Sequence, residues 1–287
     1  MENPTNLEER ITNSLETLSQ SNKRLARFVL DNRYFVSFVS ANQIGEKNKV
    51  SAATVVRFAQ AIGYEGYSEL QDTLRSELTS FMTAAARMQK RMDAPSPPES
   101  TPQQVFYTDI LNIERTASSL SKKDLGAALD AIQKARSILV IGAGLSSAPA
   151  AFLAHSLKVM GFDSLCVQGE GLQSAIELAR IQPDDLLIAI DLWRYVRTTV
   201  NAVSQTKEKG APVIAITDGI VSPLAQVADI AFHVVTEGIA HSLSITSLMS
   251  LLNVIVTMLA DRVPEQVYES IQRVDAAYRA NDLLIME

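Results

Sequence analysis

The sequence is poor in the residues on which disulfide, redox and metal chemistry depend. Its 287 residues include one cysteine, Cys166, and three histidines. One cysteine cannot form an internal disulfide, so a disulfide-stabilised secreted scaffold is excluded and a reducing compartment is expected. The sequence shows no cluster with metal-ligand spacing, so neither a metal nor a cofactor is predicted. Because the N-terminus lacks a basic and apolar leader, we expect a cytoplasmic protein.

Charge is also missing from one long segment, Leu243 to Ala260, which is almost long enough to cross a membrane. Four small polar residues recur in it at every third position: Ser244, Ser247, Ser250 and Asn253. This pattern favours a helix buried in a domain or subunit interface over a membrane span. We therefore expect a homodimer or homotetramer without a membrane partner.

The net charge of −6 is unevenly distributed. Residues 1–91 hold 12 Lys and Arg against 10 Asp and Glu, whereas residues 92–287 hold 14 against 22. A basic first part and an acidic second part are typical of a nucleic-acid-binding module joined to a sensing domain.

Proline marks the boundary between these two parts. Four prolines occur within residues 93–102, a density that disfavours helix and favours an extended spacer. Apolar residues recur at helical spacing before it, in residues 7–18, 25–30 and 67–82. We predict an all-helical domain over 1–91, a linker over 92–102 and a second domain over 103–287.

The second domain begins with two expected helices, 105–120 and 122–135, and continues with short aliphatic runs. Each run is continuously apolar, as in a strand covered on both faces; the runs are residues 137–142, 164–167, 186–191, 212–217 and 230–235. Helix-length segments separate them, which predicts an α/β domain with a five-stranded parallel sheet flanked by helices. Ligands bind such sheets at the carboxyl ends of strands, so we look for chemistry after Ile141, Ile190 and Ile216.

A helix-turn-helix is predicted over residues 42–58. Val55, Phe58 and Ile62 form one apolar stripe, and Ser51 is a natural N-cap for the second helix. Small residues early on the outer face would let this helix enter the major groove of DNA. The candidate DNA-binding residues are Lys49, Ser51, Ala52, Ala53, Thr54, Arg57 and Gln60. The alternative is a plain helical hairpin whose second helix is capped.

Lys49 occupies the turn position where many such motifs place glycine for a positive φ. It is expected either to carry some backbone strain or to grip the DNA backbone with its side chain.

The segment Val50-Ser-Ala-Ala-Thr-Val-Val-Arg-Phe58, followed by Ile62-Gly-Tyr-Glu-Gly-Tyr-Ser-Glu-Leu70, resembles the N-terminal signature of the RpiR family of regulators. That family joins a helix-turn-helix module to a sugar isomerase (SIS) domain, and the order here is the same. The resemblance implies a transcription regulator with a metabolite-sensing domain rather than an enzyme.

The loop after the first strand carries the first candidate effector-binding residues, Gly142, Gly144, Ser146 and Ser147. Glycines permit a tight turn, and helix-start amides together with serine hydroxyls can cradle an anion. The alternative is a turn in which a serine merely caps the helix. In SIS domains this loop helps to hold the phosphate of a phosphosugar, and Ser146 matches the family serine.

The loop after the third strand departs from the family, whose Ser-x-Ser-Gly-x-Thr pattern is replaced here by residues 191–199. The candidate effector-binding residues in it are Asp191, Arg194, Arg197 and Thr198. Asp191 would repel a phosphate unless an arginine neutralised it. Alternatively, Asp191 and the arginines form a structural pair, with Trp193 as an interface anchor.

Three later features are interpreted as mainly structural. Thr217-Asp-Gly219 and Ser222-Pro-Leu224 resemble a family stretch, and Ser222 is expected to start a helix. His233 is expected to pack in a strand. His241 and Ser242 are expected to open the long apolar helix, where His241 either lines the pocket or caps.

These observations favour a regulator that binds a double-stranded DNA operator and senses a small anionic sugar-derived effector, such as a phosphosugar or sugar acid. The first alternative is a sugar-phosphate isomerase, which would need a general base beside an intact phosphate loop. The second is a DNA-binding structural protein whose sensing pocket has decayed.

Overall fold

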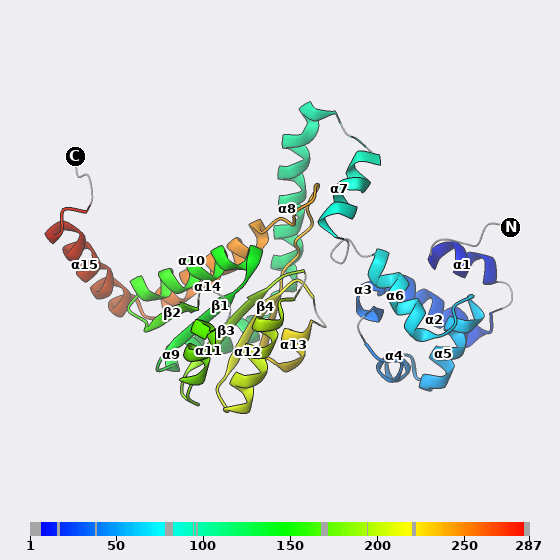
Figure 1. Ribbon diagram of the computed structural model, residues 1–287, viewed down its shortest axis with the longest axis horizontal. Coiled ribbons are helices and arrows are strands. Elements are labelled where there is room, and N and C mark those ends of the chain that lie inside the picture. Colours follow the sequence, from blue (N-terminus) through cyan, green and yellow to red (C-terminus); the bar gives the residue numbers. More distant parts are fainter. Residues whose placement is uncertain are drawn as a thin grey trace. The chain divides into compact units, whose positions relative to one another are not determined.

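In the computed structural model, the chain forms two compact units, residues 1–94 and residues 95–287 (Figure 1). The structure describes residues 7–15, 18–37, 39–77, 83–93, 95, 97–167, 172–193, 195–219 and 222–283. Helices make up the first unit, and a parallel sheet flanked by helices makes up the second, which confirms the predicted fold class.

The described residues of the first unit form helices α1 (Leu7–Ser14), α2 (Gln20–Asp31), α3 (Arg33–Val36), α4 (Ala41–Asn48), α5 (Ala52–Ala61), α6 (Tyr67–Glu77) and α7 (Ala84–Asp93). Their core includes the fully buried side chains Leu25, Ile44, Phe58, Leu70 and Leu74. The helices expected at 7–18, 25–30 and 67–82 correspond to α1, α2 and α6. Residues 78–82 of the last prediction lie outside the described residues.

The expectation that prolines exclude helix from residues 92–102 is wrong at both ends of that segment. Helix α7 continues to Asp93, and a 3-10 turn, η1 (Pro98–Ser100), leads into α8 (Thr101–Ser119). Pro98 and Pro102 both lie in the first turn of a helix. A backbone N–H has no intrahelical acceptor there, so proline is tolerated.

The second unit continues from α8 with α9 (Lys122–Lys134), β1 (Ile138–Gly142), η2 (Gly144–Ser146), α10 (Ser147–Val159), β2 (Ser164–Val167), α11 (Leu172–Ala179), β3 (Leu186–Asp191), α12 (Arg197–Glu208), β4 (Val213–Thr217), α13 (Pro223–Val227), β5 (Ile230–His233), α14 (Thr246–Arg262) and α15 (Pro264–Ala280). The strands form one parallel sheet in the order β2-β1-β3-β4-β5. The five predicted strands therefore match the five strands of this sheet.

Helices cover both faces of the sheet, which explains why each strand is continuously apolar. In β1, Ile138 and Val140 pack with α9, α10 and α14, whereas Leu139 and Ile141 pack with α11, α12 and α13. With both faces buried, polar side chains can reach solvent only at the ends of these strands.

The long apolar helix begins at Thr246 rather than near His241, because residues 234–245 form an irregular segment. Of the predicted small-residue stripe, Ser247 is fully buried within its own chain, whereas Asn253 is exposed on it. A three-residue step in a helix falls about 60° short of a full turn, so residues three apart drift around the axis. Among the described helices, no single one is long and apolar enough to span a membrane.

The position of Ser247 provides a test of the C-terminal fold. Its hydroxyl donates to the carbonyl of Val235 in the interior. Ser247→Lys would bury an ammonium group there, so the C-terminal unit should lose its cooperative thermal unfolding transition. Gln205→Lys, on an exposed face of α12, introduces the same charge and should leave the midpoint almost unchanged. Equal midpoints for both variants would contradict this placement of α14.

Candidate nucleic-acid interface and effector site

The turn between α4 and α5 depends on Gly45. A Cβ atom at this position would lie 2.5 Å from the carbonyl oxygen of Val50, so only glycine allows the two helices to approach this closely. The N–H of Val50 donates to the carbonyl of Gly45 at 2.9 Å. Lys49 has a φ of 56°, which confirms that the turn needs a left-handed residue and that Lys49 supplies it with some strain.

Helix α5 has the cap and the buried stripe that the sequence predicts. The Ser51 hydroxyl accepts from the N–H of Thr54 at 3.2 Å. Val55, Phe58 and Ile62 are almost fully buried against the other helices. The register of α5 is therefore fixed from both its start and its inner side.

The remaining candidate DNA-binding residues lie away from this core. Lys49, Ser51, Ala53, Arg57 and Gln60 are exposed, whereas Ala52 and Thr54 are half-buried. The Gln60 side-chain amide donates to the carbonyl of Glu65 at 3.2 Å, so it also braces the end of α5. The outer face therefore combines small residues near the start of α5 with a basic side chain at Arg57.

Sequence reasoning missed the residues that brace this motif. The Tyr67 hydroxyl and the Gln71 amide each donate to the carbonyls of Val36 and Val39, just ahead of α4. Arg10 donates to the carbonyl of Gly63, and its guanidinium lies 4.4 Å from the centre of the Tyr64 ring. These bonds span 28 to 53 residues, so local spacing contains no signal for them.

In the second unit, the loop after β1 is a tight turn that needs its two glycines. A Cβ atom at Gly142 would lie 2.5 Å from the carbonyl oxygen of Ser146, and Gly144 has a φ of +54°. The Ser147 hydroxyl closes the loop by donating to the carbonyl of Gly144 at 2.8 Å. Ser146 is buried, and its hydroxyl has no hydrogen-bond partner among the described residues.

Asp191 ends β3 in a buried position and bonds to the backbone. Its carboxylate accepts from the N–H of Val196 at 2.7 Å. Burial raises the pKa of Asp191 to about 6, and the charge of Asp218 adds to the rise, against the hydrogen bond from the N–H of Val196 that lowers it. Burial therefore disfavours the charged form of Asp191, and hydrogen bonding to that form offsets part of the cost.

Asp218, which follows β4, holds the same loop from the other side. Its carboxylate accepts from the N–H of Trp193 at 3.0 Å and from the Tyr195 hydroxyl at 3.2 Å. Burial raises the pKa of Asp218, and these hydrogen bonds oppose the rise. Trp193 has a φ of 70°, a strained value for a tryptophan. The two carboxylates together hold Trp193, Tyr195 and Val196 by hydrogen bonds.

Asp218 could have been found from the sequence, because it lies two residues after Ile216, at a strand end where ligands are expected. His233, the last residue of β5, lies in a strand as predicted, and its Nε2 contacts the carbonyl oxygen of Asp218 at 2.6 Å. Burial lowers the pKa of His233. The interpretation of the Thr217–Gly219 stretch as mainly structural thus overlooked a buried carboxylate at the candidate site.

The other predicted residues of this loop are less informative. Arg197 is exposed in the first turn of α12, Thr198 is half-buried, and Arg194 lies outside the described residues. The ion pairs found in the described part of the chain do not join Asp191 to Arg197. Ser222 caps α13 as predicted, accepting from the N–H of Ala225 at 3.1 Å.

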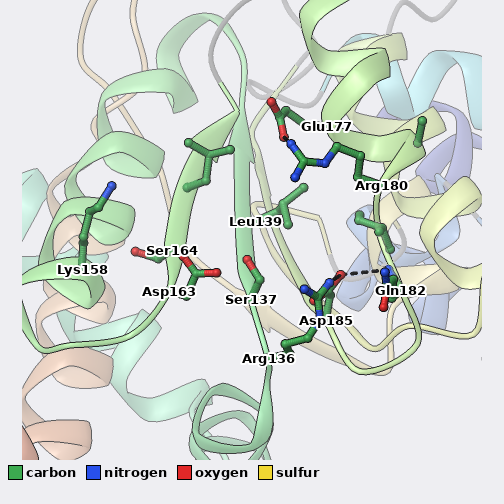
Figure 2. Close-up of a pocket in the computed structure, with 13 residues that line it drawn as sticks. Arg136, Ser137, Leu139, Lys158, Asp163, Ser164, Glu177, Arg180, Gln182 and Asp185 are labelled. Atoms are coloured by element: carbon green, nitrogen blue, oxygen red, sulfur yellow. Dashed lines mark hydrogen bonds and ion pairs between the residues drawn. The ribbon is translucent and has the colours of Figure 1, made fainter.

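The opposite edge of the sheet carries a different cavity of about 570 Å³ (Figure 2). Three basic and three acidic side chains line it, so its charges balance. Arg136 is bound to Asp185 at 2.8 Å, and Asp185 also accepts from the N–H of Gln182 (Figure 2). These groups bond to one another and hold the turn that precedes β3. They lie at the amino-terminal edge of the parallel sheet, where ligands do not usually bind.

Comparisons with known proteins agree with both halves of this description. Residues 5–80 match the model of the helix-turn-helix domain of the rpiR family, and residues 131–260 match that of the SIS domain. An HTH-type transcriptional regulator of Haemophilus influenzae is 28% identical over 225 residues, which are 78% of each chain.

Two solved structures are also similar. The sugar isomerase domain of an RpiR transcription factor from Sphaerobacter thermophilus is 37% identical with a TM-score of 0.61, over 62% of this chain and 99% of that one. The Vibrio vulnificus NanR protein, solved with ManNAc-6P, shares the fold at 21% identity and a TM-score of 0.63, over 98% and 100% of the two chains.

The fold, the motif and these matches define a DNA-binding transcription regulator in which a helix-turn-helix unit precedes a SIS domain. The chain belongs to the RpiR family.

The raised pKa of Asp191 predicts how stability depends on pH. The folded protein binds this proton more tightly than the unfolded chain, so stability should fall as pH rises from about 4 to about 6. A pKa rise of about two units corresponds to about 3 kcal/mol. Asp191→Asn removes the titrating group. Between pH 4 and pH 7, the unfolding free energy of the wild type should therefore fall by about this amount relative to that of Asp191→Asn.

Urea unfolding at a series of pH values measures this difference. Asp163→Asn is the matched control, since it removes an exposed carboxylate near the other edge of the sheet. If the unfolding free energies of the wild type and Asp191→Asn changed in parallel with pH, burial would not disfavour the charge of Asp191.

Proposed function

We propose that this regulator binds a pseudo-palindromic double-stranded DNA operator as a homodimer or homotetramer in the cytoplasm. We further propose that a small anionic effector derived from a carbohydrate binds the SIS domain and changes the affinity for that operator. The observation that carries the effector proposal is Ser146, whose buried hydroxyl has no partner among the described residues at the carboxyl edge of the sheet.

The DNA-binding proposal rests on the outer face of α5. Ala52 and Ala53 add little bulk at the start of the helix, so its N-terminal turn can approach base edges in the major groove. Arg57 lies one turn further along, where its guanidinium can reach a phosphate or a guanine. Lys49, in the turn, adds a positive charge that would favour the DNA backbone.

Arg57→Ala should weaken operator binding by about 1–3 kcal/mol without unfolding the protein. Lys134→Ala is the matched control, because it removes one exposed positive charge from α9 in the other unit. Fluorescence anisotropy with a labelled operator at one fixed salt concentration measures both affinities. Equal affinities for the two variants would place the DNA-reading face elsewhere.

The anionic group of the effector would bind the loop after β1. Helix α10 begins at Ser147 directly after η2, and the N–H of Ser147 already donates to the carbonyl of Gly144. The buried hydroxyl of Ser146, which has no partner among the described residues, is the donor that this loop would offer to the anionic group. The glycines Gly142 and Gly144 keep side chains out of this turn.

The other end of the site is unsuited to a second anion. The N–H groups of Trp193 and Val196, which could otherwise hold a phosphate, already donate to Asp218 and Asp191. Carboxylates repel phosphate but accept hydrogen bonds from hydroxyl groups. Thr217, paired with Asp191 in the sheet, adds a buried hydroxyl that has no partner among the described residues. An effector with one anionic group and several hydroxyls, such as a phosphosugar or sugar acid, fits both ends.

The isomerase alternative is less well supported. A general base must have a carboxylate or imidazole free to accept the substrate's proton. Both oxygens of Asp218 and one oxygen of Asp191 already accept hydrogen bonds that hold the loop, and His233 Nε2 contacts a backbone carbonyl. We therefore propose that the chain binds its effector without transforming it.

A thermal-shift screen against phosphosugars and sugar acids tests the effector site. An effector at 100 times its Kd should stabilise the protein by about 2.7 kcal/mol. Ser146→Ala should lose most of this stabilisation, whereas Ser147→Ala should keep most of it, because the Ser147 hydroxyl is already bound to Gly144. The reverse order would refute our assignment of Ser146. Absence of any stabilising compound would favour a DNA-binding protein without an effector.

A further inference from the structure

Helix α2 of the first unit has one side that is buried and another that carries only positive charge. The buried side consists of Leu25, Ala26 and Val29. The exposed side carries three basic residues, called here the basic face: Lys23, Arg24 and Arg27. Arg27 is four residues from Lys23 and three from Arg24, and residues at these spacings are neighbours on a helix surface. The three cations therefore form one patch.

The described part of the chain does not neutralise this patch. Residues 20–30 contain no Asp or Glu, so α2 has no acidic side chain in its first turn. The ion pairs found among the described residues involve none of Lys23, Arg24 and Arg27. In the second unit, by contrast, Lys207 and Arg262 each pair with an aspartate. The basic face thus presents its charges to solvent.

This arrangement disfavours the helix that carries it. A positive charge is favourable near the C-terminus of a helix and unfavourable near the N-terminus, because of the helix dipole. Helix α2 begins at Gln20, so Lys23 lies at the end of its first turn. Like charges three or four residues apart also repel each other. Folding of the unit therefore does not explain the basic face, whereas an anionic partner would offset both costs.

The partner whose charge matches this patch is the phosphate backbone of double-stranded DNA. A helix rises about 1.5 Å per residue, so Lys23 and Arg27 lie about 6 Å apart along its axis. Duplex DNA carries one negative charge per about 1.7 Å of its axis, so an equal length of duplex holds about three. Helix α2 also packs against α5, the helix that is proposed to read the bases (Figure 1).

We propose that the basic face of α2 binds phosphate groups of the operator beside the bases that α5 contacts. This inference rests on the proposed function, because it requires that the first unit binds DNA. Phosphate contacts carry no sequence information, but they orient a protein on the duplex and strengthen its binding to any sequence. The basic face therefore supplies affinity for duplex DNA in general, and α5 supplies selectivity.

The salt dependence of DNA binding tests the basic face. The triple variant Lys23→Ala/Arg24→Ala/Arg27→Ala of the full-length chain is compared with the wild type on the operator and on an unrelated duplex of equal length. Each phosphate contact contributes about 0.9 to the slope of log affinity against log salt concentration, so the slope should become shallower by about 3. At one salt concentration, both duplexes should lose affinity by the same factor.

A second triple variant controls for net charge. Lys122→Ala/Lys123→Ala/Lys134→Ala removes three exposed positive charges from α9 in the second unit and should keep the wild-type slope. The conservative double variant Arg24→Lys/Arg27→Lys keeps the charge of the basic face and should keep most of the affinity, because lysine also binds phosphate.

Thermal unfolding followed by circular dichroism separates lost contacts from lost structure. Alanine is the best helix former, and the triple variant of α2 also loses the repulsion between its cations. Its unfolding midpoint should therefore equal or exceed that of the wild type, although its DNA binding is weaker.

Four outcomes would overturn the proposal. They are an unchanged slope in the α2 triple variant, an equal loss in the α9 triple variant, a loss of DNA binding that accompanies unfolding of both α2 variants, and a loss confined to phosphatidylglycerol vesicles. If the wild type binds no duplex, the proposed function fails and the basic face fails with it. If Arg57→Ala weakens operator binding but the α2 triple variant does not, the proposed function stands and only the basic face is wrong.

Discussion

The parallel pairing of β1, β3 and β4 is the constraint on which the candidate effector site depends. Register within this ladder places Gly142 beside Ile190 and Asp191 beside Thr217. Segments separated by dozens of residues in the chain therefore end at one edge of the sheet. Because helices bury both faces, this edge is where the polar groups of Ser146, Asp191 and Asp218 can gather without disrupting the core.

The chemistry of this edge differs between its two sides. Around Ser146, the loop has a buried hydroxyl with no hydrogen-bond partner among the described residues. On the other side, the N–H groups of Trp193 and Val196 already donate to the carboxylates of Asp218 and Asp191. This arrangement stabilises the strained loop at Trp193. A fold shared with a phosphosugar-bound protein can thus differ in the groups that it offers to a ligand.

The irregular segment after β5 connects this edge to the helices of the unit. The N–H of Val235 donates to the hydroxyl oxygen of Thr116 in α8, and the Val235 carbonyl accepts from the hydroxyl of Ser247 in α14. Ser244 and Thr246 both donate to the carboxylate of Asp109 in α8. These bonds link the edge of the sheet to α8 and α14. A ligand bound at this edge could shift a conformational equilibrium only if its contacts differed between the two conformations.

The sequence by itself determined the features that are set by local geometry. Continuous apolar runs predicted all five strands, Ser51 and Ser222 predicted helix starts, and Lys49 marked a left-handed turn. Only the tertiary structure decided which groups a buried carboxylate bonds to: Asp218 holds Trp193 and Tyr195, which are more than twenty residues away. It also decided which side of α14 is buried. Periodicity and capping act over one or two turns, whereas the partner of a buried polar group depends on how distant segments pack.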